Sequence, residues 1–126
     1  TTTAMLVITG YNPKTVNVES WNGTGWTEIA NVNTARRNLG GGGTSTSAVI
    51  FGGNSPPIVG STEQWDGSSW AETTDLNTAG NDFGTGDSGD SGSLAIAISG
   101  SPPSGGGTRG TEEWTHVTTA VTFTSS

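Results

Sequence analysis

The chain contains no cysteine, so disulfide bonds and thiolate metal sites are both excluded. Basic residues are scarce as well: four Lys and Arg stand against eleven Asp and Glu, for a formal net charge of −7. Because that charge repels phosphate groups, we expect no nucleic-acid partner and no binding to anionic membrane surfaces. No apolar run approaches the roughly 20 residues that span a bilayer, so membrane insertion is not expected either.

Side chains suited to catalysis are few. His116 is the only histidine, and no serine or carboxylate stands at a recognisable catalytic spacing from it, so we interpret it as an exposed strand residue. The glycine run at 40–43 is not followed by the Lys-Ser/Thr of a phosphate-binding loop. The sequence therefore predicts a protein that is not an enzyme and that has no organic cofactor.

The residues that are abundant favour β-structure. Only 29% of the chain is hydrophobic, whereas glycine alone supplies 21 residues. Glycine and β-branched threonine both disfavour helices, and threonine suits extended backbone. Five tryptophans in repeating positions argue against a disordered polar chain. The composition predicts an all-β protein with a thin core.

The tryptophans belong to an internal repeat. They recur 44 residues apart, as Trp21 and Trp65 and again as Trp26 and Trp70. Periods of this length are typical of stacked repeat units, which bury their apolar faces against one another. We interpret the chain as a single repeat domain, 1–126, with units at about 4–47, 48–93 and 94–126, the last with a C-terminal extension strand at 115–126.

Each unit divides into short strands separated by turn-forming residues. In the second unit the apolar run 48–51 predicts a strand buried on both faces, and Gly52-Gly53 ends it. Strands are also predicted at 61–65 and from Trp70. The dipeptide Asp66-Gly67 between them is typical of a tight hairpin in which both residues have positive φ. The glycine-rich segment from Gly40 predicts a further strand, packed where side chains have little room.

The order of these features resembles the kelch repeat, in which an apolar strand ends in Gly-Gly and an aromatic residue and a tryptophan follow. The matching residues are AVIFGG at 48–53, Trp65, Trp70 and the LNTA turn at 76–79. The amino-acid sequences of the repeats are similar to those of kelch-like proteins from phages and environmental bacteria. The first and third units depart from the pattern, with Thr9-Gly10 and Ser99-Gly100 in place of Gly-Gly. The resemblance implies four-stranded blades of a β-propeller.

Closed propellers use typically four to eight blades, and this chain has fewer than three. The first unit begins at the second strand of a blade, and the tail after Trp114 predicts a strand without a partner in its own unit. Because unpaired strand edges template pairing with another chain, we expect an incomplete propeller or open β-array completed by strands from neighbouring subunits. The candidate inter-subunit residues are Met5, Val7, Val117, Thr119, Val121 and Phe123.

The tryptophans allow two interpretations. Flat indole rings can stack on sugars, but regular placement favours packing between units. A glutamate lies two residues before three of them, at Glu19, Glu63 and Glu112, and so shares a strand face with its tryptophan. We predict that it satisfies an indole N–H or the Arg36/Arg37 pair. The predicted repeat core comprises Trp21, Trp26, Trp65, Trp70, Trp114, Gly52 and Gly53.

Two loops carry candidate sites. Asp82, Asp87 and Asp90 lie within nine residues, interleaved with Ser and Gly, and carboxylates on a flexible loop suit Ca²⁺. A solvated insertion between two strands explains the same residues without a metal. Asn22-Gly23-Thr24 is a sequon for N-glycosylation, and a hairpin turn also accounts for its Asn-Gly.

These features favour a non-catalytic structural subunit that binds other copies of itself, head to tail and by strand sharing, in an extracellular fibre or filament. A surface appendage or a virion fibre fits this description. The rival interpretation is a glycan- or protein-binding propeller module, either as a ring of subunits or as a fragment of a longer propeller.

Overall fold

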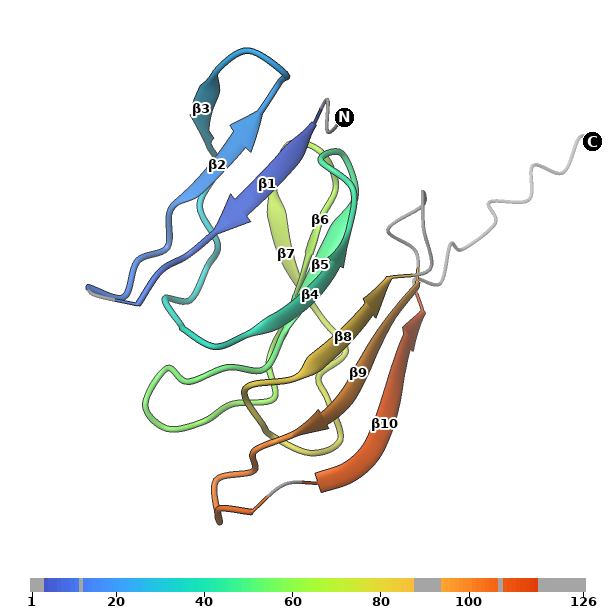
Figure 1. The fold of residues 1–126 in the computed structure, drawn as a ribbon. Coiled ribbons are helices and arrows are strands. Elements are labelled where there is room, and N and C mark those ends of the chain that lie inside the picture. Colours follow the sequence, from blue (N-terminus) through green and yellow to red (C-terminus); the bar gives the residue numbers. More distant parts are fainter. Residues whose placement is uncertain (1–3, 12, 88–93, 107, 116–126) are drawn as a thin grey trace, which may run out of the picture.

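The computed structural model describes residues 4–11, 13–87, 94–106 and 108–115. These residues form strands in three antiparallel sheets, without a helix among them (Figure 1). The all-β class predicted from the sequence is confirmed. In this part of the chain, no helix is long and apolar enough to cross a membrane.

The three sheets follow one another along the chain. The first has the order β1-β2-β3 and consists of β1 (Met5–Ile8), β2 (Val18–Trp21) and β3 (Trp26–Ile29). The second has the order β4-β5-β6-β7 and consists of β4 (Gly40–Gly43), β5 (Ala48–Phe51), β6 (Thr62–Trp65) and β7 (Trp70–Thr73). The third has the order β10-β9-β8 and consists of β8 (Gly84–Asp87), β9 (Leu94–Gly100) and β10 (Thr108–Thr115). Within the described ranges, no sheet closes on itself.

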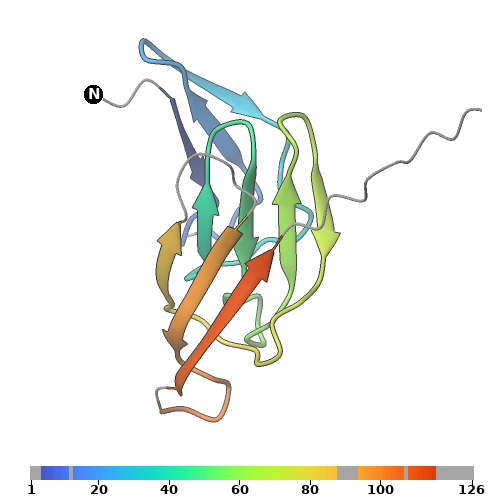
Figure 2. The same cartoon turned by 90° about the vertical axis from the view of Figure 1, so that its right-hand side faces the viewer.

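The second sheet packs against the first with one face and against the third with the other, an arrangement that can be followed in Figure 2. Alternate residues of a strand point to opposite faces, and β5 shows both. Ala48 and Ile50 belong to the core shared with the first sheet, whereas Val49 and Phe51 belong to the core shared with the third. The predicted strand buried on both faces is therefore confirmed.

The same pattern of strand pairing recurs in the sheets. Trp21 pairs with Trp26 across β2 and β3, as Trp65 pairs with Trp70 across β6 and β7. By this register β1-β2-β3 corresponds to β5-β6-β7, and β8-β9-β10 corresponds to β4-β5-β6. In the described part of the chain, the first sheet thus has no counterpart of β4, and the third has none of β7.

Three equivalent residues, one in each unit, have left-handed backbone although their side chains differ. Thr9 and Gly52, which follow β1 and β5, have φ values of 60° and 61°, and Ser99, the last residue but one of β9, has a φ of 51°. Glycine is required at Gly52 for a further reason, because a Cβ there would lie 2.4 Å from the ring of Phe83 and 2.6 Å from the carbonyl oxygen of Gly80. Thr9 and Ser99 therefore keep the left-handed backbone of Gly52, whereas at the next position Gly53 has a φ of 101° and Gly10 and Gly100 are not left-handed.

The Asp66-Gly67 hairpin differs from the prediction. Gly67 has a φ of 98°, but Asp66 is not among the described non-glycine residues with positive φ. Its side chain acts instead, since one carboxylate oxygen accepts the N–H groups of Ser68 and Ser69, both at 2.8 Å. These hydrogen bonds hold the pKa of the Asp66 carboxyl at about 2, below its ordinary value of 3.8. Asp66 is favoured here because it caps the turn, not because it tolerates left-handed backbone.

Strand β4 consists of glycine because its neighbours leave no room for a side chain. A Cβ on Gly40 would lie 2.4 Å from the ring of Phe51, and one on Gly41 would lie 2.8 Å from the carbonyl oxygen of Val49. The predicted crowded glycine strand is confirmed. Gly43 is constrained twice, by its φ of 118° and by the carbonyl oxygen of Ser47, 2.4 Å from a built Cβ.

We expect Gly43→Ala to lower the free energy of unfolding by about 1–3 kcal/mol, because it combines a clash with strained backbone. Gly25→Ala is the matched control, since a Cβ at Gly25 meets nothing within 4 Å. Urea denaturation of both variants checks this, and equal unfolding midpoints would contradict the account of β4.

Candidate functional site

The first and second sheets, which belong to successive units of the repeat, pack against each other around Trp70. Trp70 on β7 is 7% exposed and packs against Val18 and Val32 of the preceding unit. Its indole N–H donates a hydrogen bond to the carbonyl oxygen of Ala30 at 3.1 Å. The neighbouring Trp65 has its ring centroid 5.3 Å from that of Trp70. The predicted packing of tryptophans between units is confirmed for this pair.

A buried ion pair lies in the same contact. The Arg36 guanidinium, 0% exposed, approaches the Glu63 carboxylate at 3.2 Å. It also donates hydrogen bonds to the carbonyl oxygens of Ser61, at 2.6 Å, and Gly52, at 3.3 Å. Burial lowers the pKa of Arg36, and the charge of Glu63 opposes that shift. The predicted partnership between a repeated glutamate and the arginine pair is confirmed here, whereas the indole N–H groups of Trp65 and Trp70 bind backbone carbonyls instead.

The repeated glutamates also hold a turn of the preceding unit. Glu63 accepts the backbone N–H of Asn33 at 3.0 Å. At the next contact, Glu112 accepts the N–H groups of Asn77 at 2.7 Å and of Thr78 at 3.1 Å. This contact was not predicted from the sequence, although the repeated glutamates and the recurring Asn-Thr-Ala at 33–35 and 77–79 indicate it. Each of these glutamates thus joins its own unit to the unit before it.

In the part of the chain that the structure describes, the opposite face of the first sheet has no such neighbour. We call this surface the outer face of the first sheet and define it by Met5, Val7, Glu19, Trp21 and Trp26. Met5 is 42% exposed, Val7 45% and Trp26 46%. Trp26 was predicted to lie in the repeat core and is a surface residue instead. The reason is that its counterpart Trp70 is buried by a preceding unit, which Trp26 lacks among the described residues.

Trp21 and Trp26 nevertheless keep the arrangement of the buried pair. Their ring centroids are 5.3 Å apart, the same separation as between Trp65 and Trp70. Trp21 is half-buried. The outer face of the first sheet is therefore already shaped like the face that binds a neighbouring unit inside the chain.

The third sheet exposes a second apolar surface. Ile98 on β9 is 45% exposed, and Ile96 shares its face. Thr111 and Glu113 of β10 pair directly with these isoleucines and complete the surface, which we call the outer face of the third sheet. The other face of this sheet packs against the second sheet through Ala95, Ala97 and Trp114. Trp114, a predicted core residue, is half-buried there.

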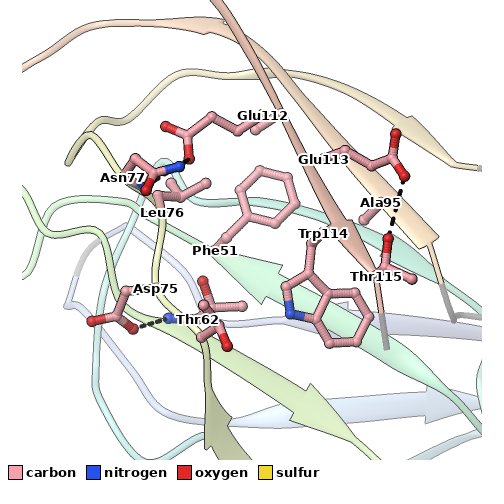
Figure 3. A pocket seen from close by; sticks show the side chains of 12 residues that line it. Phe51, Thr62, Asp75, Leu76, Asn77, Ala95, Glu112, Glu113, Trp114 and Thr115 are labelled. Atoms are coloured by element: carbon pink, nitrogen blue, oxygen red, sulfur yellow. Dashed lines mark hydrogen bonds between the residues drawn. The ribbon is translucent and has the colours of Figure 1, made fainter. Parts of the chain in front are cut away.

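A cavity of about 270 Å³ lies between the second and third sheets (Figure 3). Phe51, Thr62 and Leu76 line it, and they correspond by register and spacing to Ile8, Val18 and Val32, which surround Trp70 at the first contact. Trp114 borders the cavity from β10 (Figure 3). The cavity therefore marks the place that a fourth strand of the third sheet would cover.

A second hollow, of about 310 Å³, lies beside β1. It is lined by Met5, Leu6 and Ile8 on one side and by Gly41 and Ile50 on the other. The free edge of β1 borders this hollow, where a counterpart of β4 would lie. Met5 and Val7, predicted as inter-subunit residues, are on this edge strand, whereas Val117, Thr119, Val121, Phe123 and His116 lie outside the described residues.

The proposed glycosylation site lies at an exposed turn. The side-chain oxygen of Asn22 accepts hydrogen bonds from the N–H of Thr24 at 2.9 Å and of Gly25 at 3.0 Å. Asp66 makes the equivalent turn in the second unit without an amide nitrogen, so the turn does not depend on the nitrogen of Asn22. That nitrogen is the atom that a glycan would modify.

The described part of the structure does not bring the three candidate calcium ligands together. Asp82 has a φ of 54°, and its carboxylate accepts a hydrogen bond from the side chain of Asn38, the corresponding residue of the preceding unit. Asp87 ends β8, and Asp90 lies outside the described residues. Among the described residues, no three His, Cys, Asp or Glu side chains form a group that would hold a metal ion.

Comparison with known proteins gives no family for the chain: no protein-family model matches it, and no curated protein matches it.

Proposed function

We propose that this chain is a non-catalytic structural subunit that assembles head to tail with copies of itself. The proposal rests on one observation. Ala48, Ile50 and Trp70 are 5%, 1% and 7% exposed where the second sheet meets the first. Their counterparts Met5, Val7 and Trp26 on the first sheet are between 42% and 46% exposed. Among the described residues, a surface equivalent to the one that packs against a neighbouring sheet is thus left uncovered on the first sheet.

The other end carries the surface that would cover it. Inside the chain, the second sheet packs one face against the first sheet and the other face against the third. The outer face of the third sheet, with Ile96 and Ile98, is the next surface in this series. Because the two surfaces differ, the contact is heterologous, and it extends into a filament unless the rotation between copies closes a ring.

Strand sharing completes the proposal. The resemblance to kelch blades implies four strands for each unit, and the first and third sheets have three each among the described residues. At one edge of β1 and of β10 no described strand pairs, and there a strand of another copy would pair, for which the tail 116–126 is the candidate. Burial of Met5 and of the hollow beside β1 would accompany that pairing.

An extracellular fibre or a virion appendage is the setting that we propose for such a subunit. The chain has no cysteine, a surface rich in Thr, Ser and Gly, and an exposed Asn22 turn that accommodates a glycan. These features suit a coat exposed to solvent.

A glycan- or protein-binding module is the second candidate. One observation favours it, namely that the indole of Trp26 is 46% exposed and flat aromatic surfaces stack on sugar rings. Electron microscopy of the purified protein separates the two candidates. Regular filaments are the expected result, whereas discrete rings or single particles that bind a glycan would favour the module.

A further inference from the structure

The outer face of the first sheet contains a glutamate whose counterparts both bind a turn. Glu63 accepts the N–H of Asn33, and Glu112 accepts the N–H groups of Asn77 and Thr78. Glu19 occupies the same place on β2, directly opposite Val7 as Glu63 is opposite Ile50. Glu19 is exposed. Its position predicts the same kind of ligand that its two counterparts bind.

The acceptors for an arginine are also present. At the first contact the Arg36 guanidinium binds the carbonyl oxygens of Gly52 and Ser61 as well as Glu63. The N–H of Gly52 donates to that Ser61 carbonyl at 3.0 Å. In the first unit the N–H of Thr9 donates to the carbonyl of Asn17 at 2.9 Å, so the same backbone loop is formed there.

We propose that the outer face of the first sheet is a binding site for an exposed polypeptide turn of the Asn-Thr-Ala-Arg type on another polypeptide. Glu19 accepts the N–H of the turn asparagine and pairs with its arginine. The carbonyl oxygens of Thr9 and Asn17 accept the remaining guanidinium donors. The proposal goes beyond the proposed function, because the Asn-Thr-Ala-Arg sequence occurs in this chain only at 33–36, where Arg36 is buried against Glu63.

The second contact, made by Glu112, explains why the arginine contributes to the specificity of the site. Gly80 follows Asn77-Thr78-Ala79 where Arg36 follows Asn33-Thr34-Ala35, so the Glu112 contact has no arginine. Glu112 is correspondingly less buried than Glu63. Since Thr9 and Asn17 repeat the backbone loop that receives Arg36, the site on the first sheet suits the arginine-containing turn.

A synthetic peptide with the sequence of residues 30–39, ANVNTARRNL, tests the site directly. We expect saturation-transfer NMR to detect its binding to the full chain. Binding should weaken about tenfold when the chain carries Glu19→Gln, because the charge-assisted contacts are lost. The control chain, Glu113→Gln on the outer face of the third sheet, should bind the peptide like the parent.

Matched peptides test the role of the arginine. The Arg36→Met peptide should bind about tenfold more weakly than the parent peptide, whereas the Arg37→Met peptide should bind about equally. Equal binding to the Glu19→Gln chain, equal binding of a scrambled peptide, or no binding of the parent peptide would each overturn the proposal. Self-association of the chain is measured separately by sedimentation, so a failure of the peptide test leaves the proposed function standing.

Discussion

Glu63→Gln is expected to lower the free energy of unfolding by about 3–5 kcal/mol, one of the largest effects of any single substitution in this chain. The substitution leaves the Arg36 guanidinium, which is 0% exposed, without a counter-charge inside the protein. An unpaired buried charge is far more costly than a broken pair at the surface. Urea denaturation followed by tryptophan fluorescence measures the change.

Glu112→Gln is the matched control for this prediction. Glu112 holds the equivalent turn, but among the described side chains no arginine pairs with its carboxylate, and its hydrogen bonds are exposed. We expect a cost of about 1 kcal/mol. Adding Arg36→Met to Glu63→Gln should recover part of the lost stability, because no unpaired charge then remains. Equal small costs for Glu63→Gln and Glu112→Gln would contradict the role assigned to the buried pair.

Trp70→Ala and Trp26→Ala should separate folding from assembly. Trp70 fills the contact between two sheets, so its removal is expected to cost about 3–5 kcal/mol of stability. Trp26 holds the corresponding position on an uncovered face, and its removal should cost about 1 kcal/mol. Denaturation of the dissociated protein measures both values.

Assembly should show the reverse sensitivity. Trp26→Ala removes a large aromatic contact from the surface that we propose to bind a second copy, and such residues dominate interface energies. We expect self-association at least about tenfold weaker than in the parent, measured by size-exclusion chromatography with light scattering. A variant that assembles as readily as the parent would place the contact elsewhere.

Local features of the fold could be predicted from the sequence because neighbouring residues decide them. The apolar run 48–51 could only be a buried strand, and the glycines at 40–43 indicated a place without room for side chains. The hairpin at Asp66 was located correctly, but its mechanism was not. The difference lies in the carboxylate, which hydrogen-bonds the turn and leaves the positive φ to Gly67 alone.

The candidate site was harder to predict because burial in a repeat depends on the neighbouring unit. Trp26 and Trp70 have equivalent local sequences, and only the presence of a preceding sheet makes one a core residue and the other a surface residue. The ion pair of Arg36 with Glu63 was anticipated from the spacing of glutamate and tryptophan. The turn bound by Glu112 was not, since two of its three donors are backbone N–H groups, which every residue except proline carries.

Sedimentation velocity of the purified full chain over a wide range of concentrations tests the assembly proposal most directly. We predict that the sedimentation coefficient rises steadily with concentration, since each copy that joins by its first sheet leaves a third sheet free for the next. A single species with the mass of one chain, stable and folded at every concentration, would contradict the idea that the exposed end surfaces serve to bind another copy.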